Sequence, residues 1–111
     1  MAAIESHQII RTIEQIVFKE TNSGKTPEQA VSTANTVVEN MGTAIKEIET
    51  AYADNPAVAL DKSLIFQYMS MAMLNLVLSK NIDYEPALAT AKSLITSIID
   101  TTGTLVISLN T

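Results

Sequence analysis

The chain has 111 residues, a formal net charge of −5, 47% hydrophobic residues and no cysteine. This length predicts a single domain, and the hydrophobic content predicts ordered structure. The acidic balance weighs against a nucleic-acid binder, and the lack of cysteine excludes disulfides, thiol catalysis and cysteine-bound metal.

The N-terminal segment, residues 4–20, is expected to form a helix. Apolar side chains recur on one face at helical spacing, at Ile9, Ile13, Ile16 and Val17, while Ile10 lies off that face. No basic or apolar leader precedes the segment, so we expect a cytoplasmic protein. The only histidine, His7, has Ile4 where a di-metal bundle would need glutamate, so it is expected at the surface.

A loop separates this helix from the next one. The run Ser23-Gly24-Lys25-Thr26 is similar to the end of a phosphate-binding loop, but Lys19 replaces the first glycine of that motif. A helix also precedes it where the motif needs a strand. We therefore interpret the run as a loop that ends in a helix cap. Thr26 would be the cap, Pro27 the first helical residue, and Gln29 the partner in a capping box.

The second helix is predicted over residues 27–53. Its apolar positions alternate in steps of three and four over three heptads, a pattern typical of helices that pack at a shallow angle. These positions are Val31, Ala34, Val38, Met41, Ile45, Ile48 and Tyr52. Gly42 interrupts the helix interior, where it would allow a close helix crossing.

The third helix is predicted over residues 56–80, after a cap signal at Asp54-Asn55-Pro56. Residues 63–79 carry no charge. The apolar side chains of this helix form two stripes at helical spacing. One consists of Leu60, Leu64, Met71, Leu74 and Leu78, and the other of Phe66, Met69, Met73 and Leu76. A helix that is apolar on both sides must be covered on both sides. The methionines of these stripes, Met69, Met71 and Met73, can be ordinary core residues. Alternatively, the Phe66 stripe exceeds what one molecule can cover and forms an interface.

The fourth helix is predicted over residues 86–102 or longer, starting near Pro86. Its seam again has steps of three and four: Leu88, Ala91, Ile95, Ile98, Thr102, Leu105 and Leu109. Residues 103–111 either continue this helix or form an extended tail. Gly103 and the β-branched residues oppose a helix, whereas the heptad spacing continues through them.

Four helical segments separated by three breaks predict an all-α fold in one domain, residues 1–111. The expected arrangement is an antiparallel up-down-up-down four-helix bundle. No nucleophile–base pair and no metal-ligand cluster is visible, so we expect neither an enzyme nor a cofactor. The uncharged stretch is slightly short for a membrane span and contains Gln67, Ser70 and Asn75, so a buried helix is preferred over a membrane-crossing one.

Three short motifs in the first half of the chain carry a family resemblance. They are Ser6-His7-Gln8-Ile9-Ile10, Thr26-Pro27-Glu28-Gln29-Ala30 and Gly42-Thr43-Ala44-Ile45. In these motifs the chain resembles the R-body (refractile inclusion body) structural proteins of the bacterial killing-trait family. It lacks that family's glutamine-rich run after the second helix and its Ala-Thr-Thr-Gly features. The resemblance implies a small helical building block that polymerises into ribbons and has no catalytic residues.

These observations leave two kinds of function open. The first is a non-enzymatic, self-associating structural subunit, with an interface at Phe66, Met69, Met73, Leu76, Ile98, Leu105 and Leu109. The alternative is a small helical adaptor, secretion chaperone or immunity-type protein that binds a partner's apolar helix. The expected partner is therefore this chain itself or another protein, and neither nucleic acid nor a membrane is preferred.

Overall fold

The computed structural model of the chain describes residues 6–55, 58 and 60–102, which form a bundle of four helices. The helices are α1 (Ser6–Asn22), α2 (Pro27–Ala51), α3 (Lys62–Lys80) and α4 (Tyr84–Thr102). The predicted all-α bundle is confirmed, and the described residues contain no strand. The question of a helical or extended tail falls on residues 103–111, outside the described residues.

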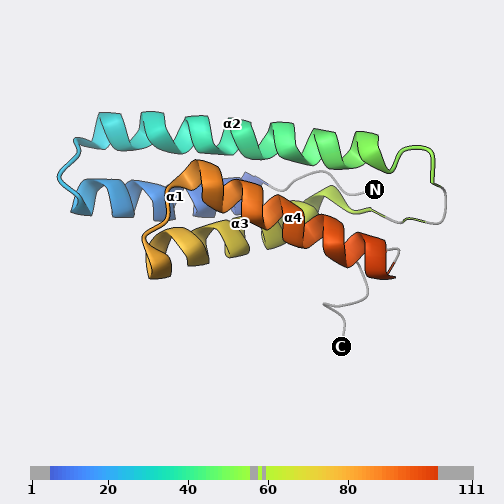
Figure 1. Cartoon of the computed structure of the whole chain (residues 1–111). Coiled ribbons are helices and arrows are strands. Elements are labelled where there is room, and N and C mark those ends of the chain that lie inside the picture. Colours follow the sequence, from blue (N-terminus) through green and yellow to red (C-terminus); the bar gives the residue numbers. More distant parts are fainter. Residues whose placement is uncertain (1–5, 56–57, 59, 103–111) are drawn as a thin grey trace.

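The four helices form two hairpins (Figure 1). Packing is most extensive between α1 and α2 and between α3 and α4, and it is sparser between the hairpins. The Ser63 hydroxyl donates to Gln8 Oε1 at 2.9 Å, and the hydroxyls of Thr12 and Ser70 share a hydrogen bond of 2.8 Å. These pairs follow the same order along both helices, so α1 and α3 run parallel.

A second set of polar contacts joins the hairpins along α2 and α4. Lys92 Nζ donates to Glu47 Oε1 at 2.7 Å, and the Tyr52 hydroxyl donates to Asp100 Oδ1 at 2.7 Å. These pairs also follow one order, so α2 and α4 run parallel to each other. Together with the reversal in each hairpin, seen in Figure 1, successive helices alternate in direction.

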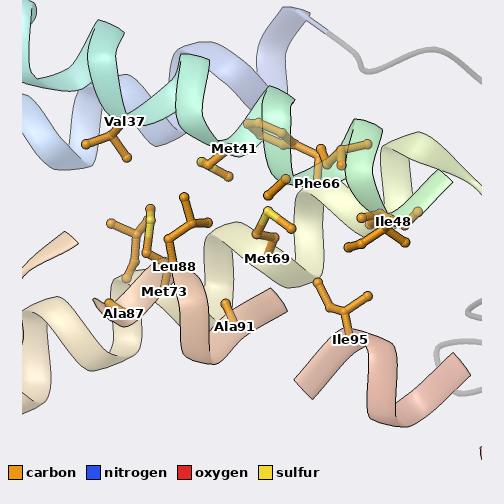
Figure 2. Packing of buried hydrophobic residues seen from close by; sticks show 14 of the residues in the cluster. Val37, Met41, Ile48, Phe66, Met69, Met73, Ala87, Leu88, Ala91 and Ile95 are labelled. Carbon is orange, nitrogen blue, oxygen red and sulfur yellow. The ribbon is translucent and has the colours of Figure 1, made fainter. Parts of the chain in front are cut away.

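The core lies between the two hairpins and takes side chains from all four helices (Figure 2). Its fully buried large side chains include Ile16 of α1, Met41 and Ile48 of α2, Phe66, Met69 and Met73 of α3, and Ile95 and Ile99 of α4. Because large apolar groups leave water together here, this cluster supplies most of the favourable free energy of folding.

The predicted inner face of α1 is confirmed, but that of α2 is partly wrong. Ile16 is buried, its neighbours on that face pack against the core, and Ile10 is exposed. On α2, Val31 is exposed instead of buried, because the inner face is turned toward Ala30, Ala34, Val37, Met41, Ala44, Ile45 and Ile48. A Cβ added at Gly42 would meet no atom within 4 Å, so no close helix crossing occurs there among the described residues.

The start of α2 has the predicted capping box. Thr26 Oγ1 accepts from the backbone N–H of Gln29 at 3.2 Å, and Gln29 Oε1 accepts from the backbone N–H of Thr26 at 3.1 Å. Pro27 occupies the first helical position. The Gly-Lys-Thr run is thus explained by a loop and a helix cap, and Gly24 adopts a positive φ of 100° in that loop.

The predicted start of α3 near Pro56 is wrong. The helix begins at Lys62, where the Asp61 side chain accepts from the backbone N–H groups of Ser63 and Leu64. Asp61 can cap because its carboxylate bonds N–H groups that have no partner within the helix. The connection between α2 and α3 is therefore longer than predicted, while α4 begins two residues earlier than predicted, at Tyr84.

Candidate interaction surface

The stripe of α3 that was predicted to be an interface lies mostly in the core. Phe66, Met69 and Met73 are each at most 2% exposed, and Figure 2 shows them pointing between the helices. This part of the interface prediction is wrong, because α3 is turned so that this stripe is covered by the other helices of the same chain.

The remaining predicted interface residues divide into two groups. Leu76 and Ile98 are half-buried and pack against the core, so they offer only part of their surface to a partner. Leu105 and Leu109 lie outside the described residues.

The surplus of apolar surface is on the opposite side of α3. Met71 is 53% exposed and Leu78 is 52% exposed, whereas Leu74 between them is buried. The amides of Gln67 and Asn75 are exposed on the same side. We call Leu64, Gln67, Met71, Asn75 and Leu78 the outer strip of α3. It carries no charge, so it resembles the centre of a protein interface more than an ordinary helix surface.

A groove of about 430 Å³ runs between this strip and α1. On the α3 side it is lined by the apolar side chains Met71, Leu74 and Leu78 and by the polar side chains Gln67, Ser70 and Asn75. On the α1 side it is lined by polar residues that include Arg11 and Gln15. The groove exists because α1 and α3 are sparsely packed against each other. Its large apolar side chains therefore come from α3, where polar groups lie between them, and its α1 wall is polar.

The apolar surface continues past the groove toward the end of α1. A neighbouring hollow is lined by Phe18 together with Gln15 and Leu78, and Phe18 is 59% exposed. Three large apolar side chains, Phe18, Met71 and Leu78, thus border two adjoining hollows on one face of the bundle.

The floor of the groove contains a buried hydrogen bond between hydroxyl groups. Thr12 and Ser70 are 3% and 8% exposed, and their oxygens are 2.8 Å apart. Thr12 also donates to the backbone carbonyl of Gln8 at 3.1 Å, which leaves Ser70 as the donor in the shared bond. A buried hydroxyl without a partner costs free energy, so this bond fixes how α1 and α3 are aligned along their axes.

A buried carboxylate joins the hairpins at one end of the bundle. Glu20 accepts from Lys25 Nζ at 2.6 Å, from Lys19 Nζ at 3.4 Å and from the Tyr84 hydroxyl at 3.3 Å. Burial alone would raise the pKa of the Glu20 carboxyl, but the hydrogen bond and charge of Lys25, helped by Lys19, lower it below the ordinary value. Burial and the adjacent Glu20 charge raise the pKa of Tyr84. The contacts of Glu20 with Lys19, Lys25 and Tyr84 therefore hold the end of α1 to the start of α4.

Tyr52 forms a similar structural contact between the end of α2 and α4. The hydrogen bond to Asp100, together with burial and the Asp100 charge, raises the pKa of the Tyr52 hydroxyl to about 12. The same hydroxyl lies 3.3 Å from the backbone carbonyl of Thr96. Both sets of contacts hold the two hairpins together.

Within the described part of the chain, no three His, Asp or Glu side chains gather where they could hold a metal ion. Nor does any helix there have the length and apolarity that a membrane crossing needs. Comparisons with protein-family models, curated proteins and solved structures found no match.

Sequence reasoning did not single out Phe18, Arg11 or the amides of the outer strip as surface features. Phe18 carried a usable signal, because it lies four residues from Glu14 and opposite the Ile9 face on a helical projection. Gln67 and Asn75 carried a second one, since primary amides favour water over a core without hydrogen-bond partners.

Proposed function

We propose that this chain is a non-enzymatic, self-associating helical structural subunit. The observation that carries the proposal is the uncovered apolar surface of α3, with Met71 and Leu78 each more than half exposed. Single exposed hydrophobic residues are normal, but a gathered set beside a groove is typical of a surface that another molecule covers.

The charge distribution supports a protein partner. The chain has a net charge of −5, yet residues 63–79 carry no charge. Interface centres are depleted of charged residues in the same way, because desolvating a charge without a partner is costly. The resemblance of the first half to R-body proteins implies the same kind of subunit, and it stays a prediction.

A second candidate is an adaptor, secretion chaperone or immunity-type protein that binds a foreign amphipathic helix. It is favoured by the composition of the α1–α3 groove, whose lining includes Arg11 and His7 and, among the residues that the structure describes, no acidic side chain. A helix with an apolar stripe and flanking acidic residues would match both walls. In this case the isolated chain stays monomeric, and one defined protein co-purifies with it.

Light scattering after size-exclusion chromatography, over a range of protein concentrations, tests the first function. We expect the average mass to rise from that of a 12.0 kDa monomer as the concentration increases. The Met71→Ser/Leu78→Ser double variant is expected to remain monomeric. Leu94→Ser is the matched control, because Leu94 is 51% exposed on α4 and lines neither hollow. A wild-type chain that is monomeric at every concentration would refute self-association.

A further inference from the structure

The outer strip of α3 has the same chemical order in both directions. It consists of Leu64, Gln67, Met71, Asn75 and Leu78, at steps of three, four, four and three residues. The order is apolar, amide, apolar, amide, apolar, with Met71 at the centre. Leu64, at one end, is half-buried and packs against the core, so it offers only part of its surface, and the other four residues are exposed.

This symmetry has a direct consequence for two copies of the chain. In a twofold interface, residue i of one copy faces residue j of the other, and j faces i. An axis that crosses α3 at Met71 sets each Met71 against the other. It also sets Leu64 against Leu78 of the second copy, and Gln67 against Asn75. Every apolar group then meets an apolar group, and every amide meets an amide that can both donate and accept.

The charges on α1 fit the same axis. The Thr12–Ser70 hydrogen bond places Thr12 of α1 beside α3 one residue from Met71. Arg11, which lines the groove, and Glu14, which is exposed but lines neither hollow, lie before and after Thr12 along α1. An axis that passes between them sets Arg11 of each copy against Glu14 of the other. In this arrangement each Arg11 guanidinium therefore meets the Glu14 carboxylate of the other copy.

We propose that two copies dock through the outer face of α1 and α3, about a twofold axis that crosses α3 at Met71 and α1 between Arg11 and Glu14. The inference rests on the proposed self-association and specifies its geometry. A second copy is preferred over a foreign helix because a foreign partner imposes no symmetry on the order of residues in the strip. Antiparallel packing of α3 against α3 of the second copy follows from the axis.

Cysteine cross-linking measures this geometry directly, since the native chain has no cysteine. Residues on the axis come within disulfide distance of their own copies, so Met71→Cys is expected to form a covalent dimer on mild oxidation. Leu78→Cys is not, because its two copies are separated along the helices by about 21 Å, at 1.5 Å per residue. An equimolar mixture of Leu64→Cys and Leu78→Cys is expected to cross-link to each other, and Leu94→Cys is the surface control.

Charge reversal provides a second, non-covalent measurement on the full-length chain. Arg11→Glu and Glu14→Arg are each expected to weaken self-association about tenfold, and the double variant Arg11→Glu/Glu14→Arg to restore it, because the exchanged charges pair again. Light scattering or sedimentation at low salt gives the dissociation constants.

The outcomes separate this proposal from the function on which it rests. Suppose that wild type self-associates and Met71→Ser/Leu78→Ser does not, but Met71→Cys fails to cross-link or Leu78→Cys cross-links to itself. This result overturns the twofold axis and still supports self-association. A chain that never associates, or that binds only a foreign helix in the groove, overturns both.

Discussion

The orientation of α3 can be tested by truncating the two methionines that lie on its opposite sides. Met73 is fully buried, so Met73→Ala removes three buried groups, at about 0.8 kcal/mol for each buried methylene equivalent. That gives about 2.4 kcal/mol, and the cavity left behind raises the expected loss to about 3 kcal/mol. Met71 is 53% exposed and leaves no cavity, so Met71→Ala is expected to cost about 1 kcal/mol or less.

This comparison is well controlled because both changes replace methionine by alanine within the same helix. The difference in helix propensity therefore cancels between them. Urea unfolding followed by circular dichroism, at low micromolar protein, gives both free energies of unfolding. A loss of about 3 kcal/mol corresponds to a fall in Tm of roughly 13 °C in a domain of this size.

A Met71→Ala variant as destabilised as Met73→Ala in dilute solution would contradict this orientation of α3. It would mean that α3 buries the stripe assigned here to the surface. At high protein concentration the expectation changes, since an interface formed only by folded chains stabilises them by mass action. Wild type should then gain stability with concentration, whereas Met71→Ala should gain less.

Three further predictions concern the polar contacts. The lowered pKa of Glu20 means that its stabilisation is present above its ordinary pKa of about 4.5 and is lost as the pH falls through the lower folded-state value. Glu20→Gln should thus cost about 1.5–3 kcal/mol in urea unfolding at pH 7 and progressively less as the pH falls below 4.5. Glu39→Gln, at an exposed carboxylate, should change stability by under about 0.5 kcal/mol at pH 7. Thr12→Val and Ser70→Ala should each destabilise the chain by about 1–3 kcal/mol, and the double variant by less than their sum; strictly additive losses would show that the hydroxyls do not interact. Thr26→Ala should lower the thermal stability by about 1 kcal/mol through loss of the cap, and an unchanged Tm would contradict the capping box.

The features that the sequence predicted correctly are those set by neighbouring residues. The capping box at Thr26 and Gln29 needs only the local chain, because its donors and acceptors lie within one helical turn. The inner face of α1 was predictable for a related reason: its apolar residues lie on one side, and polar residues such as Glu14 and Gln15 lie on the other. In both places one pattern had no competitor.

The start of α3 was predicted wrongly because two cap signals compete within a few residues. Asn55-Pro56 and Asp61 each supply a side chain that can bond free N–H groups. The residues that follow Asp61 begin the long uncharged run that packs against the rest of the bundle. Tertiary packing therefore selects the second cap, and such packing cannot be derived from the local sequence.

The most consequential wrong prediction concerned which stripe of α3 is buried. The prediction was wrong because the two stripes of α3 have similar apolar content. When a helix is similarly apolar on two sides, the helices that pack against it determine which side is buried. Here the core lies on the side of Met69 and Met73. What distinguishes the sides is polar chemistry: the buried side has Ser70, whose single hydroxyl is bonded to Thr12, whereas the outer side has primary amides. An amide needs up to four hydrogen bonds and a hydroxyl fewer, so a core accepts the hydroxyl more readily.

The same amides explain how an apolar strip can be exposed on a folded monomer and still serve as an interface. Gln67 and Asn75 separate Met71 from the leucines at each end, so no long continuous apolar surface faces water. In the twofold arrangement the amides bond each other, and their desolvation is compensated, whereas against an apolar partner they would be buried without partners. Gln67→Leu/Asn75→Leu should therefore strengthen association while broadening it to non-specific aggregates, which light scattering would detect as a polydisperse mass distribution. A variant that forms only a tighter, uniform dimer would show that the amides do not contribute to specificity.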